Sequence, residues 1–222
     1  MFNPNSNYYF LSIDAEFSGP SIIENSMINI GCVLYNMNSE IGKFNLSLDL
    51  VIDLREGTTW NQECINEFWI KNLEPNKLRQ RILNKINILH YKEAMNKFYQ
   101  FYQNCYKISN GNLFILSDHI DIDATWINYY LNLCGFPSLH LLSNSFVPLI
   151  DLHSLYSGFA GILPDEIKIF ENKNNLRFKA FNYLLYKYNV KEKPITIYDH
   201  RSINDAKWNA ESFLIFVRKI NK

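Results

Sequence analysis

The chain has 222 residues, and its 22 Lys and Arg residues are balanced by 22 Asp and Glu residues, so its formal net charge is zero. With 47% hydrophobic residues it can bury a substantial core, and its length suits one sizeable domain. The charge balance argues against a polybasic protein that holds nucleic acid by bulk charge, although bound cations can supply positive charge locally.

Three features of the sequence indicate its environment. The cysteines at 32, 64, 105 and 134 are widely spread without a C-x-x-C pair, which argues against disulfides or structural zinc and favours a reducing compartment. The N-terminus lacks a basic region followed by an apolar run, so no secretory signal is expected. No run approaches the roughly 20 apolar residues of a membrane-spanning helix. We expect a soluble protein of the cytoplasm or another intracellular compartment.

The first part of the chain predicts three strands joined as a meander, after a polar arm that we expect to be flexible. The arm covers residues 1–7, the strands 8–13, 26–35 and 42–54, and a polar turn 36–40. Apolar positions at helical spacing follow, and Pro75 divides the first two helices. These helices cover residues 61–72, 75–87 and 91–107.

The remaining segments alternate between short apolar strands and helices. The strands are expected at 113–116 and 146–150, and the helices at 123–134, 151–158, 176–189 and 204–220. No repeat or Pro/Gly/Ser-rich linker interrupts the pattern. The sequence therefore predicts one α/β domain over residues 1–222.

Two carboxylates stand at the end of the first predicted strand, in the segment SIDAEFSGP. Because side chains alternate across a strand, Asp14 and Glu16 point to the same face. Their repulsion is relieved when a cation lies between them, and carboxylate oxygens suit Mg²⁺ or Mn²⁺. The pair is a candidate metal site, and its alternative is an ordinary pair of surface acids.

Asp123 follows the apolar strand at 113–116 after a short loop and opens a helix. Taken alone, it is an ordinary acidic residue at a helix N-terminus, where the helix dipole favours it. Asp118 and Asp121 compete with it for any metal role.

His200 precedes the last predicted helix, five residues before Asp205, in the segment DHRSINDAKWNAESFL. A His in this position can lie over the ligands of a carboxylate in the first helical turn. Taken alone, it is a solvent-exposed loop residue.

In combination, the three segments resemble the motifs of the DEDDh family of 3′–5′ exonucleases, in the family's order and over nearly the whole chain. SIDAEFSGP matches the first motif, ILSDHIDIDATWINYYLNLCG resembles the second, and the segment that contains His200 resembles the third. Arg201 stands where the tyrosine branch of the superfamily has Tyr, so the histidine branch fits. The second motif departs from many relatives, which have a His-Asn pair where this chain has Asp118 and His119.

The resemblance implies an RNase H-like fold, a mixed central sheet flanked by helices. It implies two Mg²⁺ or Mn²⁺ ions, bound by Asp14, Glu16, Asp123 and Asp205. Asp121 stays open as the alternative to Asp123, which the apolar spacing of the following helix favours. His200 is the implied general base for hydrolysis of the terminal phosphodiester, with release of a nucleoside 5′-monophosphate.

The implied partner is single-stranded nucleic acid with a free 3′ end. Phe17 follows Glu16 and is a candidate to stack on a terminal base, with a core position as its alternative. Trp69 resembles a Trp of the small phage and bacterial exonuclease branch and is a second candidate for substrate binding. RNA and DNA both stay open, and so does the oligomeric state, a homodimer included.

Three other interpretations stay in view. EFSGP is also similar to the first motif of poly(A)-specific deadenylases, which share the catalytic superfamily. A catalytically inactive relative that binds nucleic acid or protein is a different class, and it is disfavoured because all five motif positions are filled. An accessory proofreading subunit of a polymerase would share the chemistry and differ in its partner.

Overall fold

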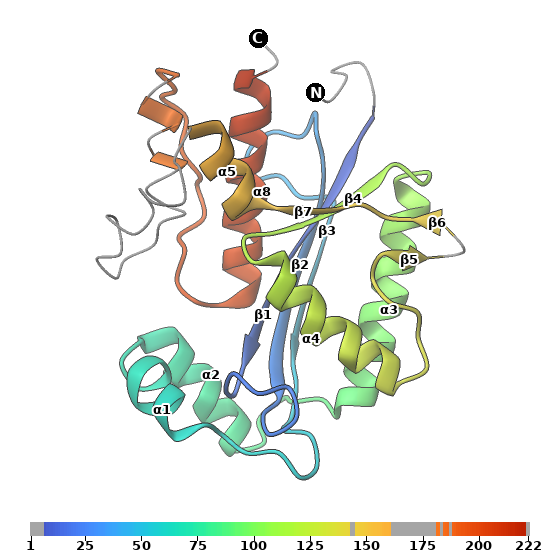
Figure 1. Cartoon of the computed structure of the whole chain (residues 1–222), viewed down its shortest axis with the longest axis vertical. Helices are drawn as coiled ribbons and strands as arrows, with labels where there is room; N and C mark the ends of the chain where they lie inside the picture. The colour runs from blue at the N-terminus through green and yellow to red at the C-terminus, as the bar shows by residue number, and fades with distance from the viewer. Residues whose placement is uncertain (1–6, 143–144, 161–180, 183, 187, 221–222) are drawn as a thin grey trace.

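A mixed sheet of five strands runs through the molecule (Figure 1), in the order β3-β2-β1-β4-β7. The strands are β1 (Tyr9–Phe17), β2 (Met27–Asn36), β3 (Leu46–Val51), β4 (Leu113–Ser117) and β7 (Leu149–Asp151). The first three form an antiparallel meander, and β4 and β7 add to β1 in parallel. A separate hairpin pairs β5 (Leu141–Leu142) with β6 (Ser145–Phe146).

The computed structural model describes residues 7–142, 145–160, 181–182, 184–186 and 188–220. The expected arm at 1–7 lies outside this range except for Asn7, and so do residues 176–180 of the helix expected at 176–189. The described helices are α1 (Gln62–Cys64), α2 (Leu73–Leu83), α3 (Tyr91–Ile108), α4 (Ile120–Leu133), α5 (Leu152–Ala160) and α8 (Ser202–Ile220), with a π-helical turn η1 (Ile65–Trp69).

Helices cover both faces of the sheet (Figure 1). One core cluster joins Leu11, Ile13 and Ala15 of β1 to α3 and α4, and a second joins Phe10 of β1 to α5 and α8. All ten residues of β2 are buried because both layers cover this strand. The mixed sheet flanked by helices that the sequence predicts is therefore confirmed.

The alternation along β1 decides where its acidic residues point. Leu11, Ile13 and Ala15 face α3 and α4. Asp14 and Glu16 fall on the opposite face, together with Phe10, and this face is covered by α8.

Two predicted element boundaries are wrong for identifiable reasons. Pro75 does not divide the helices: the break comes at Asn72, and Pro75 lies in the first turn of α2, where the missing N–H removes no helical hydrogen bond. The strand predicted at 146–150 is two strands, because β6 pairs with the hairpin strand β5 and β7 with β4.

Gly31 lets the last helix approach the sheet closely. It pairs with Asp14 across β1 and β2. A Cβ atom at this position would lie 2.1 Å from the backbone carbon of Ser202 and from the backbone nitrogen of Ile203. The absence of a side chain at Gly31 therefore allows the start of α8, which carries Asp205, to lie against the strand that carries Asp14.

We expect Gly31→Ala to displace the start of α8 from the sheet. Overpacking of this kind costs about 1–3 kcal/mol of unfolding free energy, which denaturant unfolding measures. The matched control is Gly158→Ala in α5, where an added Cβ would meet nothing within 4 Å. Wild-type stability in the Gly31 variant would contradict the close approach of α8.

Within the described residues, no helix is long and apolar enough to cross a membrane. All four cysteines are free, and Cys32 and Cys105 are buried.

Candidate active site

Five carboxylates gather where β1, the turn after β4, the start of α4 and the start of α8 meet. One oxygen each from Asp14, Glu16 and Asp205 lie within 4.8 Å of one another, and we call these residues the first triad. One oxygen each from Asp14, Asp118 and Asp123 lie within the same distance, and we call these residues the second triad. Asp14 belongs to both triads, so they form one continuous acidic centre.

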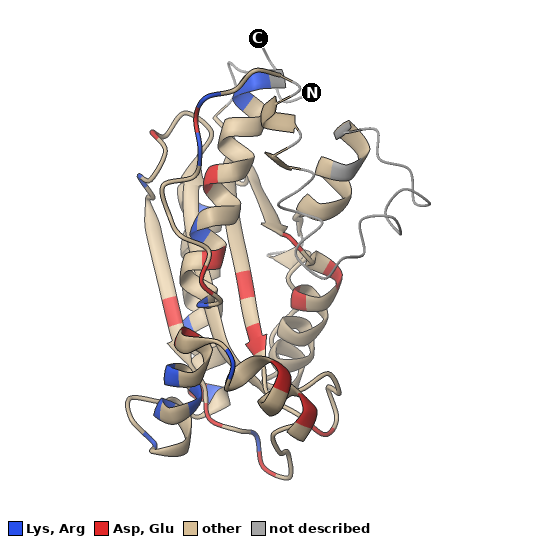
Figure 2. Ribbon diagram, turned by 90° about the vertical axis from the view of Figure 1, so that its left-hand side faces the viewer, with Lys and Arg blue, Asp and Glu red and all other residues tan. Residues whose placement is uncertain are grey.

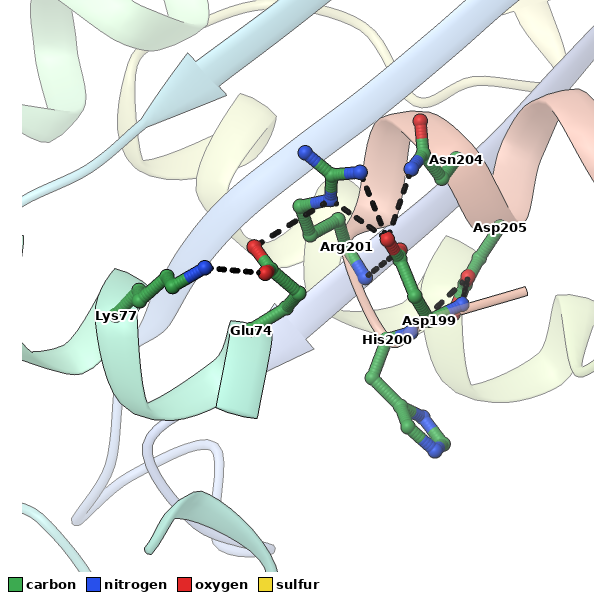
Figure 3. A network of polar contacts seen from close by, with 7 residues as sticks. All are labelled: Glu74, Lys77, Asp199, His200, Arg201, Asn204 and Asp205. Carbon is green, nitrogen blue, oxygen red and sulfur yellow. Dashed lines mark hydrogen bonds and ion pairs between the residues drawn. The ribbon is translucent and has the colours of Figure 1, made fainter. Parts of the chain in front are cut away.

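The first triad joins the two ends of the sequence. Asp14 and Glu16 come from the C-terminal end of β1, and Asp205 comes from the first turn of α8. The backbone N–H groups of Asp199 and His200 both donate to Oδ1 of Asp205, at 3.2 Å (Figure 3). The loop before α8 is thereby fixed to a member of the triad.

The second triad is held by hydrogen bonds to Asp123. Its Oδ1 accepts from the backbone N–H of Ala15, at 3.2 Å, and its Oδ2 accepts from the hydroxyl of Ser117. The Ala15 contact ties α4 directly to β1, between Asp14 and Glu16. The helix α4 begins at Ile120, about one turn earlier than predicted, and within it Asp123 is buried whereas Asp121 is exposed.

Burial and mutual repulsion disfavour the ionised form of these carboxyl groups when no cation is bound. Burial raises the pKa of Asp123 to about 7, although the Ser117 hydroxyl and the Ala15 amide oppose this rise. The pKa of Glu16 is also well above its usual range, because of burial first and then the charges of Asp205 and Asp123. A donor set made only of carboxylate oxygens suits a hard divalent cation such as Mg²⁺ or Mn²⁺, so these residues fit such ions.

These pKa shifts predict how stability depends on pH. The pKa of Asp123 is about 7 in the fold against an ordinary value of 3.8, so the folded chain holds a proton that the unfolded chain has lost between these values. In EDTA, the free energy of unfolding should fall as pH rises from about 4 to 7. Over this range the unfolded chain has already lost the Asp123 proton, whereas the folded chain loses it only near pH 7. Mn²⁺ should reduce this fall because it stabilises the ionised form.

Thermal unfolding between pH 4 and 8, with and without Mn²⁺, measures this dependence. The matched variant is Asp123→Asn, in which the fall in EDTA should be smaller because the group no longer titrates. An equal fall in the wild type and in this variant would assign the dependence to other groups.

A pocket of about 570 Å³ opens beside the acidic centre, with Glu16 in its lining. This volume lies within the range of small-molecule sites, roughly 300–1,000 Å³. The ring of Phe17 stacks on that of Trp126, with centroids 4.6 Å apart and planes at 20°. Phe68 and Trp69 from η1 also line the pocket, which we call the aromatic pocket.

The π-helical turn sets the orientation of these two η1 residues. The N–H of Ile70 donates to the carbonyl of Ile65 at 3.0 Å, five residues back. Trp69 is 1% exposed and packs edge-on against Trp60, whereas Phe68 is only partly buried. Trp69 therefore supports the wall of the pocket, and Phe68 presents more of its surface there.

His200 is held between two aromatic rings. Its imidazole makes edge-on contacts with Phe68 and Tyr198, each at 5.1 Å between centroids. The ring points away from the carboxylate of Asp205 (Figure 3). Its backbone has a φ of 59°, in the left-handed region that a non-glycine residue rarely adopts. His200 is thus adjacent to the acidic centre through its backbone, and to the aromatic pocket through its side chain.

Charged residues link the loop before α8 to α2. Arg201 donates from Nε to Asp199 at 2.9 Å, and the same nitrogen lies 3.8 Å from Glu74 (Figure 3). Figure 2 shows Lys and Arg gathered at the end of the molecule where α2 lies. Several of these bases have acidic partners, in the ion pairs Lys71–Glu67, Lys77–Glu74 and Lys85–Asp53.

The structure thus brings Asp14, Glu16 and Asp205 together, joins Asp123 to them through Asp14, and leaves Asp121 outside both triads. Sequence reasoning treated Asp118 as a competitor of Asp123, whereas both belong to the second triad. It did not identify Phe68 and Trp126 as pocket residues. The available signal was their position in the sequence, since Phe68 adjoins Trp69 and Trp126 lies one helical turn after Asp123.

No protein-family model matches the sequence, and no curated protein sequence matches it. Solved structures do match the fold. The nuclease domain of 3′hExo, a DEDDh family member bound to rAMP, has a TM-score of 0.58 at 12% identity, over 96% of this chain and 94% of that one. A full-length 3′-exonuclease has a TM-score of 0.59 at 14% identity, over 96% and 83% of the two chains.

Exonuclease I of E. coli, in complex with a dT13 oligonucleotide, has a TM-score of 0.57 at 12% identity, over 96% of this chain and 40% of that one. This chain therefore spans less than half the length of exonuclease I. Identities in this range show the fold alone. The chain has the RNase H-like α/β fold found in 3′-exonuclease domains of the DEDDh type.

Proposed function

We propose that the chain is a metal-dependent 3′–5′ exonuclease that releases nucleoside 5′-monophosphates from single-stranded nucleic acid. The observation that carries the proposal is the presence of two carboxylate triads sharing Asp14 at the edge of the aromatic pocket. Glu16 belongs to both the first triad and the pocket lining. A terminal nucleotide whose base lies in the pocket would therefore have its phosphate beside the carboxylates.

Four acids are the proposed ligands of two divalent ions: Asp14, Glu16, Asp123 and Asp205. Mg²⁺ or Mn²⁺, when bound, supplies positive charge for the phosphodiester and lowers the pKa of water. The chain orients the ligands through backbone N–H groups: Ala15 donates to Asp123, and His200 donates to Asp205.

His200 is the proposed general base, since imidazole takes up a proton near neutral pH. In this role its side chain turns from the Phe68 and Tyr198 rings towards the acidic centre. Its backbone is already fixed to Asp205, so the required movement is mainly a rotation of the side chain. Such a rotation is coupled to the pocket, because Phe68 contacts both the imidazole and the pocket space.

Phe17 and Phe68 are the proposed contacts of the terminal base. Stacking of a base on an aromatic ring is worth about 1–3 kcal/mol and tolerates every base, as a non-specific exonuclease requires. Trp126 backs Phe17, and Trp69 backs Phe68. In this proposal Trp69 acts on the substrate mainly by holding Phe68 in place.

The test is a degradation assay on matched RNA and DNA oligomers, labelled at the 5′ end, with Mg²⁺, Mn²⁺ or EDTA. We expect a ladder of shortened strands and nucleoside 5′-monophosphates with either ion, and no products in EDTA. A strand blocked by a 3′-phosphate should be degraded more slowly. Absence of products with both ions, or equal degradation in EDTA, would overturn the proposal.

The same assay separates the alternative functions. Degradation confined to poly(A) strands would favour a deadenylase. Binding of a strand without cleavage in either ion would favour an inactive relative. RNA and DNA arms of equal sequence report the preferred sugar directly, because a contact to the 2′-OH distinguishes the two polymers.

A further inference from the structure

Asp118 is an acidic member of the centre that the four-acid pattern does not include. It lies in the turn between β4 and α4 and is only 5% exposed. One of its carboxylate oxygens lies within 4.8 Å of oxygens from both Asp14 and Asp123. Its Oδ2 also lies 3.9 Å from Nε2 of His119, whose side chain is 52% exposed.

The two triads differ in which elements build them. The first triad uses β1 and α8, and the second uses β1, the turn after β4 and the first turn of α4. Each triad can therefore surround its own cation, with the shared Asp14 between the two. Mg²⁺ sites that rely on substrate phosphates usually have one or two carboxylates, whereas the second triad offers three, so it can hold an ion before the substrate arrives.

We infer that Asp118 is a direct ligand of the second ion, so that the chain holds two divalent ions before nucleic acid arrives. This inference rests on the proposed function, because it assigns a ligand at the same metal centre. Asp118 and Asp123 are then joint ligands and not alternatives. The role of Asp118 in this centre is to fix the second ion in the substrate-free protein.

The experiment is a titration of the full chain with Mn²⁺ alone, followed by calorimetry and by electron paramagnetic resonance of free Mn²⁺. We expect two ions per wild-type chain without nucleic acid. Asp118→Asn should retain one ion with nearly unchanged affinity and bind the second at least about 10-fold more weakly. The matched control is Asp121→Asn, which removes an exposed acid outside both triads from the same segment. It should keep both ions.

Thermal unfolding separates a ligand from a structural residue. For each protein, the unfolding temperature in EDTA is the reference from which the effect of Mn²⁺ is measured. The stabilisation added by Mn²⁺ should be smaller in the variant. A structural role predicts an unchanged gain from Mn²⁺, and this result would overturn the inference.

Two further outcomes keep the inference distinct from the proposed function. A wild-type chain that binds one ion without nucleic acid, yet degrades strands with Mn²⁺, overturns the inference and leaves the exonuclease intact. If Asp118→Asn binds two ions with wild-type affinity, the inference is likewise overturned and the exonuclease is left intact. Absence of both ion binding and degradation overturns the proposed function itself.

Discussion

Asp14→Asn is expected to abolish turnover, with a loss of more than about 10³-fold. Asp14 is the one residue that belongs to both triads, so its substitution removes a negatively charged ligand from both ion sites. Asp118→Asn and Asp205→Ala each affect one triad. Asp14→Asn should therefore be the most damaging of the carboxylate substitutions, both in Mn²⁺ titration and in the single-turnover rate of strand degradation.

The matched control is Asp49→Asn on β3. Asp49 is an exposed acid of the same sheet that accepts from Nδ2 of Asn29 at 2.9 Å and lies outside both triads. It should keep both ions and wild-type turnover. Two bound ions in Asp14→Asn, with turnover near that of the control, would refute the shared role of Asp14.

Local spacing was sufficient to predict most of the sheet. The residues of β1 alternate between the two cores, so the face shared by Asp14 and Glu16 followed from strand geometry. The helices α3 and α8 extend over nearly the predicted ranges because their apolar positions recur at helical spacing. The π-helical turn η1 escaped prediction because, over five residues, its spacing does not differ detectably from that of an α-helix.

The candidate site was less predictable because it depends on contacts between distant segments. Gly31 shows this well: nothing in its neighbours indicates that α8, more than 170 residues later, lies against it. A glycine inside a strand does indicate close approach of another backbone, so part of the signal was present. The place of Asp118 in the second triad depends on the path of the turn after β4, which no local spacing specifies.

His200→Ala is expected to reduce turnover by about 10²–10⁴-fold, the range for loss of a general base. Mn²⁺ titration should be unchanged, because the residue's link to Asp205 is made by its backbone N–H, which alanine retains. The φ of 59° is less favourable for alanine than for histidine, but the two backbone hydrogen bonds to Asp205 should keep the shape of the loop. Oligonucleotide binding should also stay close to that of the wild type.

Two comparisons decide whether the imidazole acts as a base. The matched control is His140→Ala, which changes a histidine beside the β5–β6 hairpin, outside the acidic centre and the aromatic pocket, and should leave turnover intact. In the wild type, turnover should fall at acidic pH because protonated imidazole cannot accept a proton, and this fall should be weaker in His200→Ala. Because Phe68 is a proposed contact of the terminal base, Phe68→Leu should raise the Michaelis constant, while the fall in turnover at acidic pH should stay because His200 is retained. Full turnover in His200→Ala would make the histidine only a packing partner of Phe68 and Tyr198, and proton removal would then need another group.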